Sequence, residues 1–314
     1  MTAFMHLISF LGTGALYVPV LLVVFWCVSP KAGARATIVL GLSGMINGLL
    51  KLAFHTPRPY WTDPGTKGLE SESTFGMPSG HSQNAVVAYG LLGAGLRRRA
   101  VWAGAVVMIV LIGISRVYLG VHSPGQVLAG WAIGAAILGS ALLLEARIVA
   151  WWTRRPIAVQ VLLALLLTLG LLGLWALAVR HLHGWRMPSA WAAGIVKAGG
   201  TVQPVTLRDG AMGAGTLFGG VAGVSWLAHR GWFEAGGALW PRLARLPVGL
   251  AGAGVILLAE KPAGHSVAAL FVGSAVLGLW TAAGAPETFV RMGLADRGTR
   301  LLTRPGEITA AGPS

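Results

Sequence analysis

The sequence predicts an all-α fold, a polytopic bundle of about nine transmembrane helices. Two observations predict this class. The chain has 314 residues, of which 55% are hydrophobic and only 11% are charged. Apolar runs close to the roughly 20 residues that a helix needs to cross the hydrocarbon layer recur along its whole length. The same pattern excludes a soluble multidomain protein, so chain length alone would mislead about the number of domains.

The expected helices follow the apolar runs in order. No basic residue precedes the first run, 6–28, and no small-residue cleavage site is evident, so we interpret it as a membrane helix and not as a secretory signal. The charged flank "WPRLARLPVG" blurs the start of the shortest run, 246–260, and leaves a tilted or interfacial start open. The other expected spans are 33–54, 80–96, 100–119, 124–145, 157–179, 210–228 and 264–284.

The basic residues predict the orientation. Nine spans place the chain ends on opposite sides, and fifteen of the 24 Lys and Arg residues fall in the loops of one side. The positive-inside rule assigns that side to the cytoplasm, with the N-terminus and the long loops 55–79 and 180–209 outside. The alanine- and arginine-rich composition is typical of a GC-rich bacterium, so we expect a bacterial inner membrane.

Several classes of site are not expected. The net charge of +14 does not indicate nucleic acid, because the basic residues sit in short loops and form no soluble face with stacking aromatics. The single cysteine, Cys27, excludes an internal disulfide and is interpreted as a small core residue. No H-E-x-x-H or similar ligand spacing appears, so we expect no metal and no cofactor. The sequence leaves the oligomeric state open.

Two further patterns concern packing. Within the second long loop, "MPSAWAAGIVKAGG" is either a short interfacial helix that rests Trp191 and Ile195 on the bilayer surface or an irregular loop. Glycines at intervals of four let membrane helices approach closely, and they recur at Gly130 and Gly134 and at Gly215, Gly219 and Gly223.

Three polar clusters interrupt the apolar pattern, and the span order places all of them at one membrane face. They are "KLAFHTPRP" with Lys51 and Arg58, "MPSGHS" with Ser79, Gly80 and His81, and "SRVYLGVHSPGQ" with Arg116, His122 and Gln126. Charges near the hydrocarbon are costly, so they are functional candidates. We interpret the remaining histidines as polar anchors, and Asp63, Glu70 and Glu72 as solvated loop residues, with a role at the pocket mouth left open.

This set of residue types suits a phosphate. Arginine forks grip phosphate oxygens bidentately, and lysine supplies a point charge. Ser79, Gly80 and His81 stand where an expected helix begins, and free N–H groups at a helix N-terminus point at an anion. Two histidines can divide the chemistry, because one can attack phosphorus while the other protonates the leaving oxygen.

The motifs K-x6-R-P at 51–59, P-S-G-H at 78–81 and S-R-x5-H at 115–122 resemble, in this order, the signature of the type 2 phosphatidic acid phosphatase family. That family shares its site with vanadium haloperoxidases and glucose-6-phosphatases. The resemblance implies a haloperoxidase-like phosphatase core in residues 1–155, with the signature within 51–126. Residues 156–314 would add further transmembrane helices to the same bundle.

The resemblance also implies roles. His122 would be the nucleophile that forms a phosphohistidine, and His81 would be the general acid. The remaining matched residues would bind the phosphate and stabilise the transition state, namely Lys51, Arg58, Ser79, Gly80 and Arg116.

Gln126 departs from the family pattern, since most lipid-phosphatase members resemble H-x3-D. Ser123 and Pro124 predict a helix cap and first position, which places Gln126 in the first turn. Its amide oxygen can accept an N–H from His122 and fix the tautomer, but it supplies no negative charge. The glucose-6-phosphatase branch is similar in its glutamine and its nine spans.

The leading hypothesis is therefore an outward-facing membrane phosphatase, with phosphatidate-like lipids or polyprenyl pyrophosphate as substrates. A soluble sugar phosphate is the alternative that Gln126 and the span count favour. Phosphotransfer to another lipid, and a transporter that retains a degenerate site, are the further alternatives.

Overall fold

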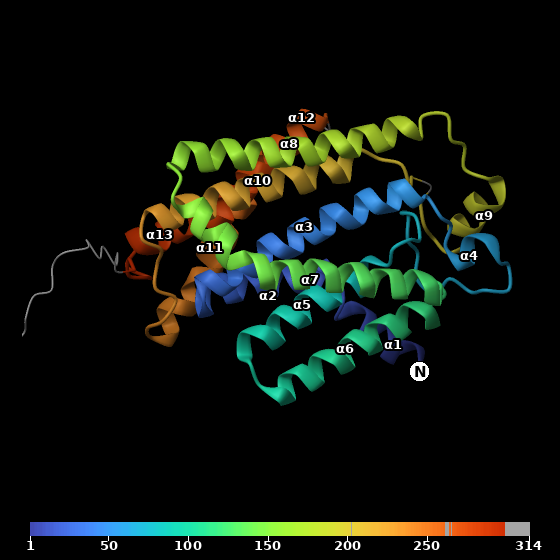
Figure 1. The fold of residues 1–314 in the computed structure, drawn as a ribbon, viewed down its shortest axis with the longest axis horizontal. Coiled ribbons are helices and arrows are strands. Elements are labelled where there is room, and N and C mark those ends of the chain that lie inside the picture. The colour runs from blue at the N-terminus through green and yellow to red at the C-terminus, as the bar shows by residue number, and fades with distance from the viewer. Residues whose placement is uncertain (202, 261–263, 265, 299–314) are drawn as a thin grey trace, which may run out of the picture.

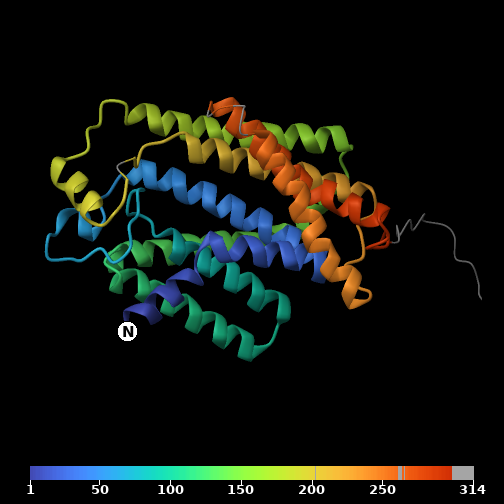
Figure 2. The same cartoon turned by 180° about the vertical axis from the view of Figure 1, so that it is seen from behind.

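The computed structural model describes residues 1–201, 203–260, 264 and 266–298. These residues form helices and no strand, apart from an isolated antiparallel bridge between Phe233 and Arg297. Figures 1 and 2 show an elongated bundle whose long helices run roughly along its longest axis. The predicted all-α transmembrane bundle is thereby confirmed.

The helices, in chain order, are α1 (Thr2–Phe10), α2 (Gly14–Val23), the π-helix η1 (Val24–Val28), α3 (Pro30–Phe54), α4 (Pro59–Thr62), α5 (Gly80–Leu96), α6 (Arg99–Tyr118), α7 (Pro124–Thr153), α8 (Ile157–His181), α9 (Ser189–Lys197), α10 (Arg208–His229), α11 (Leu239–Glu260), α12 (Val267–Leu279), the π-helix η3 (Trp280–Gly284) and α13 (Ala285–Arg291). Among the described residues, seven helical segments are long and apolar enough to cross a membrane. The pair α1 and α2–η1, which is bent by 46°, is an eighth if its two helices are counted as one span. The expected span at α5 has only 17 residues, so the count of nine stays a prediction.

The helix starts nearest the polar clusters are confirmed. Ser79 caps α5 by accepting the N–H of Ser82, and Ser123 caps α7 by accepting that of Gln126. Both caps satisfy N–H groups that have no partner inside the helix. The start of α11 differs from the prediction, because the helix begins at Leu239 and continues through Pro247.

The predicted close approach at the glycines is also confirmed. A Cβ atom on Gly219 would lie 2.0 Å from the carbonyl oxygen of Ala275, so the backbones of α10 and α12 are in contact. A Cβ atom on Gly130 would lie 2.6 Å from the carbonyl oxygen of Ser79. This second contact holds the start of α5 against the first turns of α7, and two of the three polar clusters meet there.

The second long loop contains a short helix, α9, as one of the two predicted alternatives had it, but Ile195 does not rest on the bilayer surface. Ile195 is fully buried, and a Cβ atom on Gly194 would lie 2.6 Å from the carbonyl oxygen of Tyr60. The Trp191 ring lies 6.0 Å from that of Trp61. Packing against α4 removes the buried side of α9 from water. The second loop therefore covers the first.

Figure 1 places α4, α9 and the N-terminus at one end of the bundle, which we call the site end, and α13 at the other. The apolar core at the site end includes buried residues of both long loops, among them Trp61, Phe75 and Ile195. Which end faces the cytoplasm stays a prediction from the charge count.

Candidate active site

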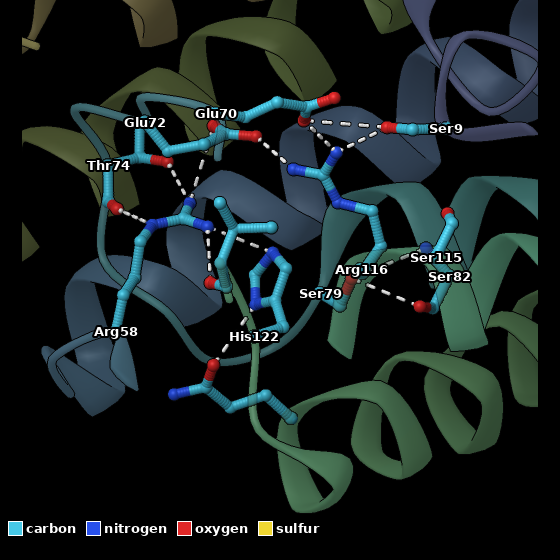
Figure 3. A network of polar contacts seen from close by, with 12 residues as sticks. Ser9, Arg58, Glu70, Glu72, Thr74, Ser79, Ser82, Ser115, Arg116 and His122 are labelled. Atoms are coloured by element: carbon cyan, nitrogen blue, oxygen red, sulfur yellow. Dashed lines mark hydrogen bonds and ion pairs between the residues drawn. The ribbon is translucent and has the colours of Figure 1, made fainter. Parts of the chain in front are cut away.

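The three polar clusters converge at the site end. The first runs from the last turn of α3 into the following loop, the second begins α5, and the third runs from the end of α6 to the first turn of α7. Figure 3 shows side chains of all three clusters in one network, together with the loop that carries Glu70, Glu72 and Thr74.

Arg58 is fully buried and lies at the centre of the network. Its Nε donates to the carbonyl oxygen of Thr74 at 2.7 Å, and its Nη2 donates to the Thr74 hydroxyl at 3.0 Å. Its Nη1 lies 3.0 Å from the carbonyl oxygen of Val121 and 3.0 Å from Nε2 of His122. These acceptors hold the guanidinium in one orientation, in which Nη1 is directed at the imidazole of His122.

The contacts of His122 define its tautomer. A guanidinium only donates, so Nε2 of His122 must accept from Arg58. The ring proton then lies on Nδ1, which donates to Oε1 of Gln126 at 3.0 Å. The predicted contact between Gln126 and His122 is thereby confirmed.

His122 is kept neutral. Burial, together with the positive charges of Arg58, Lys51 and Arg116, lowers its pKa well below the usual range. A neutral imidazole with its lone pair on Nε2 has the form that a nucleophile needs.

Gln126 is itself fixed by its surroundings. Its Nε2 donates to the carbonyl oxygen of Pro57 at 2.8 Å, and its Oε1 also accepts the backbone N–H of Ser123 at 3.2 Å. The second of these bonds completes a capping box at the start of α7. The helix cap therefore orients the amide that orients His122.

Arg116 is fully buried and faces two carboxylates. Its Nη1 donates to Glu70, and its Nη2 lies 2.6 Å from Oε1 of Glu72. The other oxygen of Glu72 lies 3.4 Å from Nη2 of Arg58, so one carboxylate bridges both arginines. Ser9 of α1 accepts a further bond from Arg116.

The interpretation of Glu70 and Glu72 as solvated loop residues was therefore wrong, whereas Asp63 is exposed as expected. The physical reason is that two buried guanidinium groups require compensating charge. Burial alone would disfavour the Glu72 carboxylate, but the charges of Arg58, Lys51 and Arg116 prevail and hold its pKa at about 2.

The remaining predicted residues lie beside this network. Lys51 Nζ donates to the Thr74 hydroxyl at 2.8 Å. Ser79 is fully buried at the cap of α5, and Gly80 is so close to α3 that a Cβ would lie 2.9 Å from Oδ1 of Asn47. His81 is in the first turn of α5, near enough to Arg116 for that charge to act on it. All eight predicted residues thus lie at the site end, and their roles stay predictions.

Sequence reasoning missed several members of the site. The Thr74 hydroxyl accepts from both Lys51 and Arg58, but nothing in its loop distinguishes it from other threonines. Asn47 did carry a signal, since an amide inside an apolar run needs partners. It donates to Oε1 of Gln83 at 2.9 Å and to the carbonyl oxygen of Pro78 at 3.4 Å. These bonds tie α3 to the start of α5.

The described part of the chain contains no group of three or more His, Cys, Asp or Glu side chains that could hold a metal ion.

Comparisons with known proteins agree with the motifs. The profile of the PAP2 superfamily matches residues 32–150, and that of a PAP2 superfamily phosphatase transmembrane extension matches residues 211–297. Phosphatidylglycerophosphatase B of Bacillus subtilis is 32% identical over 140 residues, which are 40% of this chain and 66% of that protein. Lipid phosphate phosphatase delta of Arabidopsis thaliana is 29% identical over 138 residues, which are 39% of this chain and 33% of that protein.

One solved structure is similar as well. It is the crystal structure of a transmembrane PAP2 type phosphatidylglycerolphosphate phosphatase from Bacillus subtilis, with 30% identity and a TM-score of 0.40. The match covers 47% of this chain and 77% of that one. The two curated relatives, by contrast, are matched over just under two thirds and about one third of their own lengths.

Proposed function

The chain belongs to the PAP2 superfamily, and from this premise we propose that it is an integral membrane phosphatase acting on phosphorylated lipids. The reaction passes through a phosphohistidine on His122 at the extracytoplasmic face. The observation that carries the proposal is the state of His122, which is neutral, with Nδ1 donating to Gln126 and the Nε2 lone pair directed at Arg58.

Substrate binding replaces one anion with another. The Glu72 carboxylate bridges Arg58 and Arg116, the position that suits a phosphate group carrying two or three charged oxygens. Arg116 also has a buried Nε without a hydrogen-bond partner, which gives it one more N–H for a phosphate oxygen. Lys51 and the N–H groups at the start of α5 add further positive potential. We expect the loop that carries Glu72 to withdraw when the phosphate binds.

The first chemical step forms the phosphohistidine. The Nε2 lone pair of His122 attacks phosphorus, and the bond between phosphorus and the lipid oxygen breaks. That oxygen keeps the bonding electrons and takes a proton from His81, so it leaves as a hydroxyl group of the dephosphorylated lipid. The arginines and Lys51 stabilise the charge on the equatorial oxygens, which is the main catalytic contribution in phosphoryl transfer.

The second step regenerates the enzyme. Water attacks phosphorus, His81 accepts one of its protons, and the bond between Nε2 and phosphorus breaks to release inorganic phosphate. Gln126 keeps the Nδ1–H in place during both steps, although it adds no negative charge to support an imidazolium.

Two arguments support a lipid substrate: the similarity to lipid phosphatases and the position of the site at the end of the membrane bundle. Two relatives are a phosphatidylglycerophosphatase and a lipid phosphate phosphatase. A site at the end of a membrane bundle also suits a headgroup presented from a leaflet. A soluble sugar phosphate remains the second candidate, which Gln126 favours.

The test is phosphate release from purified protein in detergent with a chelator present. The substrates are phosphatidylglycerophosphate, phosphatidate, polyprenyl pyrophosphate and glucose 6-phosphate, and the control is His122→Ala. Release from a lipid that His122→Ala abolishes supports the proposal, and preferential release from glucose 6-phosphate would replace the substrate class. Phosphorylation of an added lipid acceptor would indicate a phosphotransferase. No release from any substrate would contradict the proposed activity.

A further inference from the structure

A groove of about 420 Å³ runs between α3 and α10 and ends at the phosphate site. Figures 1 and 2 show these two helices side by side. Lys51 and Thr74 line the groove at the site end, and Thr37 lines it on the first turns of α3, far from the site. The phosphate site and the groove are therefore continuous.

The groove is hollow because glycines line both helices. Gly41 and Gly44 of α3 face Gly213 and Gly220 of α10 across it. A Cβ atom built on Gly44 or on Gly220 would have no other atom within 4 Å, so both positions border open space. Gly41 and Gly44 are also exposed, which leaves the groove open sideways to the surrounding lipid.

The lining changes character along its length. Its ionisable side chains, Lys51 and Asp209, both belong to the site end, the second of them in the first turn of α10. Beyond them the lining consists of apolar side chains, glycines, the amide of Asn47 and two threonines, Thr37 and Thr216. A ligand that fits the groove thus has a charged head and a long apolar body.

We propose that this groove binds the hydrocarbon chain of the phosphorylated lipid, with the phosphate held beside Lys51. The proposal rests on the proposed function and specifies how that site selects its substrate. The rise along α3 from Thr37 to Lys51, 14 residue steps of 1.5 Å each, is about 21 Å. One leaflet accounts for about half of a hydrocarbon layer that is about 30 Å thick. The groove is longer than this half-thickness, so a hydrocarbon chain from one leaflet fits along it.

The same geometry gives the later part of the chain a function. Helix α10 lies within the transmembrane extension matched at 211–297, apart from its first residues, and it forms one wall of the groove. The residues of the phosphate site all belong to segment 51–126. The groove for the hydrocarbon chain needs α3 from the first half of the polypeptide and α10 from the second. A soluble sugar phosphate would leave most of the groove unused.

The test fills the groove without changing the phosphate site. Gly44→Leu and Gly220→Leu each place a side chain in the open space, and Gly139→Leu is the matched control. Gly139 lies in α7, its Cβ position is equally free of neighbours, and it does not line the groove. The measured quantity is the ratio of kcat/KM for a long-chain phosphatidate to kcat/KM for its water-soluble short-chain homologue.

We expect either groove variant to lower this ratio about tenfold or more, because each methylene that loses its contact weakens binding several-fold. The control should leave the ratio within twofold. An unchanged ratio in both groove variants, with unfolding temperatures equal to that of the wild type, would overturn the proposal. If one variant fails to fold, the other decides.

A second measurement separates this proposal from the proposed function. A phosphatidate with a photoreactive group in mid-chain should crosslink to residues of α3 and α10, and Gly44→Leu should reduce that crosslinking. Crosslinks confined to other helices would overturn the groove assignment even in an active enzyme. A wild type that releases no phosphate but crosslinks within the groove would overturn the phosphatase and support the binding site.

Discussion

Buried arginines stand at both ends of the bundle, and their hydrogen-bond acceptors differ. Arg245 of α11, at the end opposite the site, is 1% exposed, and within the described part of the chain it donates to backbone carbonyl oxygens alone. These belong to Leu294 at 2.8 and 3.0 Å, to Trp26 and Ala235 at 2.9 Å each, and to Gly236 at 3.2 Å. At the site end, Arg116 instead donates to the side chains of Ser9, Glu70 and Glu72.

The difference distinguishes a structural arginine from a ligand-binding one. Carbonyl oxygens are fixed by the backbone, so no ligand can replace those around Arg245 without unfolding part of the chain. The carboxylate of Glu72 belongs to a loop side chain, and an anion with stronger charge can take its place. Burial of an arginine in a membrane bundle is therefore no sign of a site until its acceptors are known.

The largest expected effect is at the site end. We expect His122→Ala to lower kcat for lipid phosphate by about 10⁴-fold or more, because the nucleophile itself is removed. The measurement is phosphate release under saturating substrate, together with trapping of the acid-labile phosphoenzyme by mass spectrometry. His183→Ala is the control, since His183 belongs to the second long loop and was not assigned to the site. Residual activity within tenfold of the wild type would contradict the phosphohistidine.

At the other end we expect a loss of stability without a loss of chemistry. Arg245→Met leaves four carbonyl oxygens without their buried donor, which should cost at least about 3 kcal/mol and lower the unfolding temperature by several degrees. The kcat/KM of the protein that remains folded should stay within twofold of the wild type. A selective fall in kcat/KM with an unchanged unfolding temperature would break the comparison between the two ends.

The sequence predicted the site better than it predicted the surroundings of the site. The predicted order of the spans grouped Lys51, Arg58, His122 and Gln126, because alternate ends of successive spans lie at the same membrane face. Glu72 was misinterpreted, since whether a loop carboxylate is solvated depends on how the loop folds back. No periodicity encodes that path.

The same limit applies to the helices. The glycine spacing predicted that α10 approaches a neighbouring helix closely, because close approach requires small residues, but it did not predict that this neighbour is α12. The groove between α3 and α10 also contains glycines, yet no pattern distinguishes a glycine that receives a neighbour from one that borders open space. Gly219 and Gly220 are adjacent in sequence and differ in this respect. Only the helix arrangement decides it.

An intermediate effect is expected at Gln126, which separates orientation of His122 from the charge around it. Gln126→Leu should lower kcat about 10- to 100-fold, because the Nδ1–H loses its acceptor and the tautomer is no longer fixed. Gln126→Asp restores an acceptor and adds a negative charge, which favours the protonated imidazole. Its activity should recover, and the acidic limb of the pH profile of kcat/KM should move to higher pH. An acidic limb that does not move would show that this limb reports another group.

The smallest effect, and the sharpest test of the comparison, is expected at Glu72. If its carboxylate occupies the position of the substrate phosphate, then Glu72→Gln should lower the inhibition constant of inorganic phosphate a few-fold. Glu70→Gln is the control, since Glu70 contacts Arg116 but not Arg58. The folded-state pKa of Glu72 is about 2, below its ordinary value of 4.5, so its stabilisation is complete above that ordinary value and declines as pH falls toward 2. Glu72→Gln should therefore flatten the fall in unfolding temperature between about pH 5 and 3. A higher inhibition constant in Glu72→Gln would mean that the carboxylate supports phosphate binding. The acceptors around Arg116 would then be no more replaceable by a ligand than the carbonyl oxygens around Arg245, and the two ends of the bundle would differ only in the charge of those acceptors.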